Sequence, residues 1–199
     1  MRVKTDNSPA KGKILDAAQG LMLAKGYTAT TVDEICMEAG LTKGSFFHYF
    51  ESKEDLGKAA LDRFASSMFQ MMKDAPFNRK EDPLKRVFGF LDFMLGIARN
   101  RAIPKSCLIG NFSQELSGTH PEIRSLCEGY FSQWSEVLKK DLDEAKRRYK
   151  PKASFDSLSL ADHFISAMEG SLILAKAKQE TKVIEESIIH LKQYLKSLF

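Results

Sequence analysis

Residues 31–53 of this chain read TVDEICMEAGLTKGSFFHYFESK and contain two short helical segments joined by a glycine. Thr31 can cap the first segment, and Glu34 completes a capping box with it. Gly40 can end this segment, because glycine readily adopts the positive φ angle that such a turn needs. Thr42 can then cap the second segment. Two short helices at a tight turn are typical of a helix-turn-helix, whose second helix enters the major groove of DNA.

The second helix of this pair begins with small and polar side chains, as a helix must if it enters a groove about 12 Å wide. Lys43 can donate hydrogen bonds to guanine, and Ser45 can donate or accept them. The helix starts near Thr31 and Lys53 favour phosphate groups. The predicted DNA-contacting residues are Thr31, Thr42, Lys43, Gly44, Ser45, Phe47, His48, Tyr49 and Lys53.

The same stretch could instead be one more helical hairpin in an all-α core, with a solvated lysine and histidine. Residues 46–50 read FFHYF, which is an unusually dense aromatic run for a plain surface helix that follows a polar turn. This density favours a helix-turn-helix in which Phe46 packs inward and its neighbours face outward.

Apolar residues recur at three- and four-residue spacing along nearly the whole chain, which predicts an all-α fold of about nine helices. Asp82 and Pro83 together form a helix-start signal, and Pro121 and Pro151 mark later helix boundaries. We expect a DNA-binding domain over residues 1–52 and a helical effector-binding and dimerisation domain over residues 53–199.

The stretch over residues 12–58 closely resembles the TetR family of transcription regulators. The matching residues are Gly26-Tyr27, Thr31, Asp33-Glu34-Ile35, Ala39-Gly40-Leu41, Lys43-Gly44-Ser45, His48-Tyr49-Phe50 and Ser52-Lys53-Glu54-Asp55-Leu56. The resemblance implies a DNA-binding head, a variable helical regulatory body and a homodimer. It also implies DNA contacts at Thr31, at 43–45, at 47–49 and at Lys53. Phe47 departs from the tyrosine that is common in the family and cannot donate its phosphate hydrogen bond, which leaves packing against sugar.

The chain has 199 residues, a net charge of +4 and no apolar run that approaches the roughly 18 residues of a membrane span. Residues 1–58 hold eight basic and eight acidic residues, so a phosphate-binding surface must come from segregation of charge onto one face. The polar start shows no secretory signal, and three scattered cysteines do not predict a disulfide framework. We expect a cytoplasmic protein with no cofactor and no metal.

The two C-terminal helices carry apolar stripes that predict an association surface. The residues assigned to a dimer interface are Phe164, Met168, Leu172, Ile184, Ile188, Leu191 and Leu195. Periodicity alone does not separate this interface from an intramolecular core, but the family resemblance favours the dimer. A two-fold dimer also matches the symmetry of a palindromic operator in duplex DNA.

The middle of the chain is rich in methionine and aromatic residues, some of which are expected to line a pocket for an unknown small-molecule effector. The candidates for effector binding or sensing are Cys107, Phe69, Met72, Phe93, Phe112, Phe131 and Trp134.

Cys107 is also a candidate sensor, because a helix start and the neighbouring Lys105 and Arg101 would favour a thiolate. From Cys107 to about Trp134 the chain resembles the family branch that includes the N-ethylmaleimide reductase repressor and the acrylate-responsive repressor. Some members of this branch use a cysteine at this place to sense electrophiles or oxidants, although Ser106 replaces the usual preceding glycine. The alternative is that Cys107 is a small buried hydrophobic residue, as we predict for Cys36 and Cys127.

The main rival to a regulator is an enzyme with Cys107 as nucleophile and His120 or His163 as base. The chain contains no phosphate-binding loop, paired metal-ligand spacing or nucleophile elbow, so we predict that it is not an enzyme. A helical interaction protein that does not bind DNA would leave the polar turn at Lys43 and Ser45 unexplained.

Overall fold

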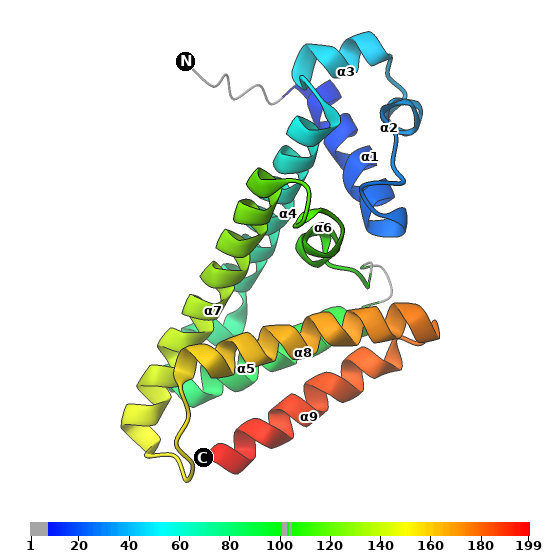
Figure 1. Cartoon of the computed structure of the whole chain (residues 1–199). Helices are drawn as coiled ribbons and strands as arrows, with labels where there is room; N and C mark the ends of the chain where they lie inside the picture. The colour runs from blue at the N-terminus through cyan, green and yellow to red at the C-terminus, as the bar shows by residue number, and fades with distance from the viewer. Residues whose placement is uncertain (1–7, 101–102, 104) are drawn as a thin grey trace. The chain divides into compact units, whose positions relative to one another are not determined.

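The computed structural model describes residues 8–100, 103 and 105–199 of the chain. Within these residues there are nine α-helices and no strand, which confirms the predicted all-α class. The helices are α1 (Pro9–Lys25), α2 (Val32–Ala39), α3 (Lys43–Tyr49), α4 (Lys53–Asp74), α5 (Pro83–Arg99), α6 (Leu108–Leu116), α7 (Pro121–Tyr149), α8 (Ser157–Lys178) and α9 (Lys182–Leu198), with a short 3₁₀ helix at Pro76–Arg79 (Figure 1). No helix in the described part of the chain combines the length and apolar character needed to cross a membrane.

Several of the predicted helix starts are built as expected. Thr31 and Thr42 accept hydrogen bonds from the backbone N–H groups of Glu34 and Ser45. Asp82 accepts from the N–H of Lys85, which leaves Pro83 at the first helical position, where its missing donor costs nothing. The short helices α2 and α3 therefore begin at residues dictated by local chemistry.

The chain divides into two compact units that do not follow its sequence order. The first contains the described residues up to Ser67 together with Leu108–Cys127, and the second contains Glu128–Phe199 and the described part of Met68–Cys107. Helix α6 thus belongs with α1–α3 and most of α4. The functional boundary expected at residue 52 stays a prediction.

The core of the first unit joins α1, α2, α3 and α4 with α6 and the start of α7. Ile14, Ile35, Phe46 and Leu56 are fully buried, each from a different helix of the head. Phe112 of α6 is also fully buried and packs edge-on against Tyr27, with their ring centroids 5.3 Å apart. The helix-turn-helix is therefore held on a continuous apolar core.

In the second unit, α9 packs against both α8 and α5. Arg86 of α5 donates from Nε to Asp141 of α7 at 2.8 Å and also pairs with Glu144. The same guanidinium donates to the backbone carbonyls of Lys80 and Glu81, so one side chain ties α7 to the start of α5.

Candidate DNA-binding interface

The turn between α2 and α3 is set by Gly40, which adopts φ 64° and ψ 36° in the left-handed region. Residues with a Cβ atom pay a steric cost in this conformation, so glycine is favoured there. Phe46 is fully buried beneath α3, as predicted, and its ring lies edge-on to that of Phe47. The buried anchor fixes which face of this seven-residue helix is presented outward.

The tip of α3 is exposed. Thr42, Lys43, Gly44 and His48 are exposed, and Phe47 keeps 57% of its surface accessible. Thr31 is also exposed, whereas Ser45 and Tyr49 are half-buried. The nine predicted contact residues are thus brought to one helix-turn-helix and its flanks.

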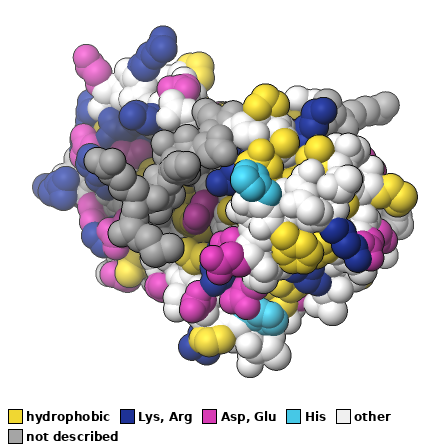
Figure 2. Space-filling view, turned by 90° about the horizontal axis from the view of Figure 1, so that it is seen from above, with side chains coloured by type: hydrophobic (Ala, Val, Ile, Leu, Met, Phe, Trp, Pro, Cys, Tyr) yellow, Lys and Arg dark blue, Asp and Glu magenta, His cyan; other side chains and the backbone are white. Residues whose placement is uncertain are grey.

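Charges around this tip are mixed, as the residue count predicts. Lys43 forms an ion pair of 2.7 Å with Asp33 of α2, and both side chains are exposed. This pairing raises the pKa of Lys43. In Figure 2, basic and acidic side chains are interspersed over the face that is shown.

Lys53 has a structural role that the sequence did not reveal. Its Nζ donates to the backbone carbonyls of Tyr27 and Thr30 at 3.1 and 3.0 Å and lies 4.2 Å from the centroid of the Tyr27 ring. Burial lowers the pKa of Lys53. The amine therefore holds the loop between α1 and α2, and its contact with phosphate stays a prediction.

Glu115 of α6 also binds this loop through its carboxylate, a contact that the sequence did not predict. Glu115 accepts from the backbone N–H groups of Tyr27 and Thr28 at 3.2 and 2.9 Å. Gly26 lies directly beneath it, at φ 88° and ψ 167°, where an added Cβ would fall 2.3 Å from Glu115 Oε1. With this extended ψ, the chain leaves α1 beneath the carboxylate of Glu115.

The capping box of α2 makes the stability of the head depend on the ionisation of Glu34. Lys25 and then Thr31 donate to Glu34, and these hydrogen bonds lower the pKa of Glu34 to about 2. The charged carboxylate is favoured by folding, so its contribution is complete above the ordinary pKa of 4.5 and is lost as the pH falls through about 2.

Carbon-13 NMR of the Glu34 carboxyl should therefore show no titration between about pH 7 and pH 3. In Lys25→Met, the largest of these hydrogen bonds is removed, and the pKa of Glu34 should rise toward its ordinary value. A native midpoint near pH 4.5 would contradict the capping box.

The second unit contains a small apolar pocket, with about 20 Å³ of free space. It is lined by Met68 and Met72 of α4, Phe90 and Met94 of α5, Trp134, Val137 and Leu138 of α7, and Ile165 and Met168 of α8. Two of the predicted effector residues, Met72 and Trp134, line it directly.

The other effector candidates lie elsewhere. Phe69 and Phe131 flank the Trp134 ring at centroid distances of 5.9 and 6.1 Å. Phe93 packs against Phe77. Phe112 belongs to the core of the first unit, because it lies against Tyr27. The remaining lining residues were missed, since their helical spacing is that of ordinary core residues.

Cys107 is buried and is not in a disulfide. Its thiol hydrogen-bonds the carboxyl group of Glu169 of α8, whose pKa is raised by burial. Lys105, expected to assist the thiolate, instead donates to the backbone carbonyls of Ile97, Asn100 and Ile103 at 2.8, 2.5 and 2.9 Å. Arg101 lies outside the described residues. Cys36 and Cys127 are buried, as predicted.

The residues assigned to the dimer interface lie inside the single chain. Phe164, Met168, Ile184, Ile188, Leu191 and Leu195 are buried, and Leu172 is half-buried. They form the core between α5, α8 and α9, which is the alternative that periodicity left open. Most of these side chains are therefore already covered within one chain, and a dimer interface on α8 and α9 stays a prediction.

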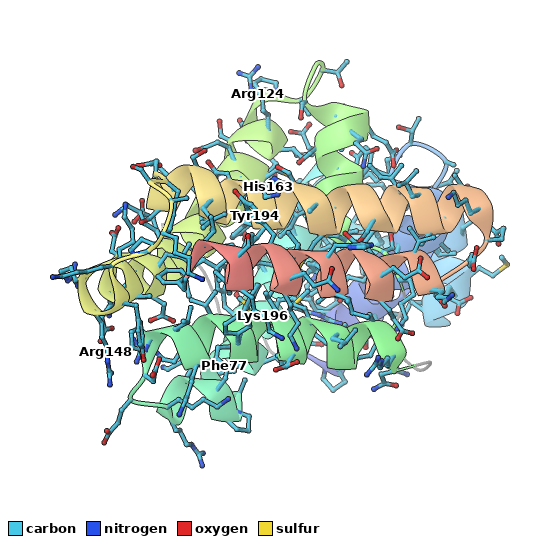
Figure 3. All side chains as sticks on the ribbon, turned by 90° about the horizontal axis from the view of Figure 1, so that it is seen from below. Phe77, Arg124, Arg148, His163, Tyr194 and Lys196 are labelled. Carbon is cyan, nitrogen blue, oxygen red and sulfur yellow. The ribbon has the colours of Figure 1, made fainter. Side chains whose placement is uncertain are left out.

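On a face of α8 and α9 beside the buried stripes, His163 of α8 lies against Tyr194 of α9 with ring centroids 5.8 Å apart, and both are labelled in Figure 3. Gly170 and Leu174 follow His163 at intervals of seven and four residues, so the three share one face of α8. Leu174 is 50% exposed, and an added Cβ at Gly170 would meet nothing within 4 Å.

Clusters of three or more histidine, cysteine, aspartate or glutamate side chains suited to a metal ion are absent from the described ranges. A capped helix-turn-helix with an exposed polar tip, joined to a helical unit with an apolar pocket, is the architecture of a DNA-binding regulator with a ligand-sensing body.

Comparison with known proteins places the chain within one family. The family model described as "Bacterial regulatory proteins, tetR family" matches residues 14–60, and that of the "Tetracyclin repressor-like, C-terminal domain" matches residues 83–191. The chain belongs to the TetR family and is a DNA-binding transcriptional regulator. Members of this family bind operator DNA and act as dimers.

Two curated relatives and one solved structure show how far the similarity extends. The transcriptional regulator AcuR of Cereibacter sphaeroides is 30% identical, over 86% of this chain and 78% of its own length. The transcriptional repressor NemR of Escherichia coli is 22% identical over 92% of each chain. The structure of a TetR regulatory protein from Rhodobacter sphaeroides matches with a TM-score of 0.82 at 26% identity, over 96% of this chain and 100% of that chain. These relatives confirm the branch expected from the sequence.

Proposed function

We propose that this protein is a homodimeric repressor that acts in the cytoplasm and leaves a palindromic operator when an effector binds its second unit. The observation that carries the DNA-binding half is the outward-facing tip of α3, held from below by the fully buried Phe46. Lys43, Ser45 and His48 supply donors and acceptors for base edges. Thr31 and Thr42 lie at helix N-termini, which favour phosphate, and Tyr49 supplies a hydroxyl group.

The dimer that we propose uses the outer face of α8 and α9, which we define by His163, Gly170, Leu174 and Tyr194. Two copies would meet there about a two-fold axis, each presenting the same patch. Gly170 permits close helix approach, and Leu174 and Tyr194 supply apolar area. Such a dimer places two α3 tips on one duplex, as a palindromic operator requires.

In the proposed mechanism, the unliganded dimer holds its two α3 helices at a spacing that fits successive major grooves. The effector prefers a conformation in which α4 has moved and this spacing fails. Only a difference in affinity between the two conformations can shift their populations, and a nearly complete switch needs roughly 10⁴-fold preference.

A gel shift with the DNA upstream of the gene tests this function. The expected result is a retarded complex at nanomolar protein whose affinity falls steeply with salt, as neutralised phosphates release counterions. The same assay, repeated with a panel of small apolar and aromatic compounds, should find one that releases the DNA. No complex with any upstream fragment would contradict the proposal.

Covalent sensing at Cys107 is a second candidate, favoured by the hydrogen bond between its thiol and Glu169. In the addition of the thiol to an α,β-unsaturated carbonyl, the sulfur forms a bond to the β-carbon and Glu169 takes the thiol proton. The resulting enolate then receives this proton at its α-carbon, so the S–H group adds across the double bond with no other reactant.

For this candidate, we expect that DNA release by reactive carbonyls is lost in Cys107→Ser, whereas release by unreactive aromatic compounds is retained. Mass spectrometry of the native chain should show one adduct at Cys107. Release that is identical in both proteins would exclude thiol sensing and leave reversible binding in the pocket.

Gly44 and Gly40 provide a matched pair of variants that separates folding from DNA binding. Gly44 lies within α3, and an added Cβ would make only an ordinary contact of 3.6 Å with Thr42 Oγ1. Gly44→Ala should therefore stabilise the head by up to about 1 kcal/mol and still weaken DNA binding, because the methyl group stands where α3 must approach the groove. Gly40→Ala should destabilise by about 1 kcal/mol, because φ is positive there.

Denaturant unfolding and the gel shift, applied to both variants, check these signs. If Gly44→Ala bound DNA as well as the native chain, α3 would not approach DNA at this residue.

A further inference from the structure

The indole N–H of Trp134 is a hydrogen-bond donor with no acceptor. Trp134 is the only tryptophan of the chain and is about nine-tenths buried on α7. Its Nε1 is shielded from solvent and has no hydrogen-bond partner. Buried donors in folded proteins are nearly always paired, because leaving one unpaired costs as much as losing a hydrogen bond. An unpaired donor at the wall of a pocket therefore indicates an acceptor that arrives with a ligand.

The pocket around this donor is otherwise wholly apolar. Its other lining side chains are methionine, phenylalanine, valine, leucine and isoleucine, with no lysine, arginine, aspartate or glutamate among them. A charged ligand group would lose its hydration there without gaining a partner, which is strongly unfavourable. The chemistry of the wall thus selects a neutral, largely apolar molecule.

Nε1 of Trp134 is shielded from solvent, so a ligand can reach it only if the wall of the pocket rearranges. Four methionines make such a rearrangement possible. Met68, Met72, Met94 and Met168 come from three different helices. Methionine side chains are unbranched and adapt their shape at low cost. We expect that rotation of one or two of them enlarges the pocket beside the Trp134 ring without moving the backbone. Met68 and Met72 belong to α4. Their rotation would therefore change the packing of the helix that moves in the proposed mechanism.

We infer that this pocket binds a neutral, mostly apolar small molecule that carries one hydrogen-bond acceptor, such as a carbonyl oxygen, and that Trp134 Nε1 donates to this acceptor. The inference deepens the proposed function, since it names the chemical class of the effector. Its test does not require DNA, because ligand binding can be followed in the free protein.

The test uses acetophenone and ethylbenzene, which have nearly the same shape and differ in the carbonyl oxygen. Because the chain has one tryptophan, its ¹H–¹⁵N spectrum contains one indole signal. Acetophenone should shift the indole proton downfield and bind roughly three- to tenfold more tightly than ethylbenzene, the ratio that one net hydrogen bond supplies. Equal affinities, no binding of either compound, or an unmoved indole proton would each overturn the inference.

Trp134→Phe is the matched variant, because it keeps an aromatic ring in the wall and removes the donor. Calorimetric titration should show that this variant binds the two compounds with equal affinity. Thermal unfolding of the variant serves as the folding control, and the comparison of the two ligands in the native chain does not depend on it.

The inference and the proposed function fail in different ways. If acetophenone binds with the indole shift but leaves the DNA complex intact in a gel shift, the pocket assignment stands and the effector role is lost. If the upstream DNA is not bound at all, the regulatory proposal fails while the ligand measurement is unaffected. The indole N–H could instead donate to the face of the nearby Phe69 or Phe131 ring. In that case, acetophenone and ethylbenzene would bind with equal affinity.

Discussion

Lys43→Ala is expected to weaken specific operator binding strongly while leaving the fold unchanged. Lys43 is the exposed cation at the start of α3, and a lysine bound to guanine contributes about 1–3 kcal/mol of base discrimination. A dimer loses this contact at both half-sites, so the affinity should fall by about 30-fold or more. Fluorescence anisotropy with labelled operator DNA measures the loss. Denaturant unfolding should show a change of less than about 0.5 kcal/mol, as is usual for an exposed side chain.

Asp33→Asn is the matched control for this variant. In the native chain, Asp33 pairs with the Lys43 amine at 2.7 Å and places a negative charge beside the tip of α3. Its removal frees the amine and lowers repulsion from the phosphates, so DNA binding should be retained or tightened. Operator binding that is unaffected by Lys43→Ala would exclude Lys43 from the interface.

Leu174→Glu is expected to convert the proposed dimer to monomers. Because a two-fold interface is isologous, one substitution places two carboxylates in the same apolar contact. An unpaired charge buried in this way costs several kcal/mol, so the dimer dissociation constant should rise by at least about 100-fold. Within a single chain Leu174 is 50% exposed, and its replacement should leave the fold of the monomer intact. Sedimentation velocity gives the oligomeric state directly.

Met71→Glu tests whether any exposed apolar residue would have the same effect. Met71 lies on α4, is 41% exposed and is outside the α8–α9 face. This variant should remain dimeric and bind the operator as the native chain does. Leu174→Glu should in contrast bind the full operator only weakly, since its two heads are no longer joined. A dimeric Leu174→Glu protein would move the interface elsewhere.

The helix-turn-helix could be predicted almost to the residue because its signals are local. Thr31, Gly40 and Thr42 act on backbone groups within a few positions of themselves, so their meaning does not depend on distant packing. The position of a dimer surface could not be predicted from such local signals. The stripe of Ile184, Ile188, Leu191 and Leu195 shows that one face of α9 is buried, but periodicity does not say whether the same chain or a partner buries it.

The sequence by itself determined the all-α class, the starts of α2 and α3, and the family. It did so because caps, glycine turns and the 3.6-residue period are properties of neighbouring residues. Only the tertiary structure decided that Lys53 holds a loop, that Glu115 lies over Gly26, and that Trp134 has an unpaired donor in an apolar wall. Each of these depends on groups brought together from distant segments, and no pattern along the chain records which segments will meet.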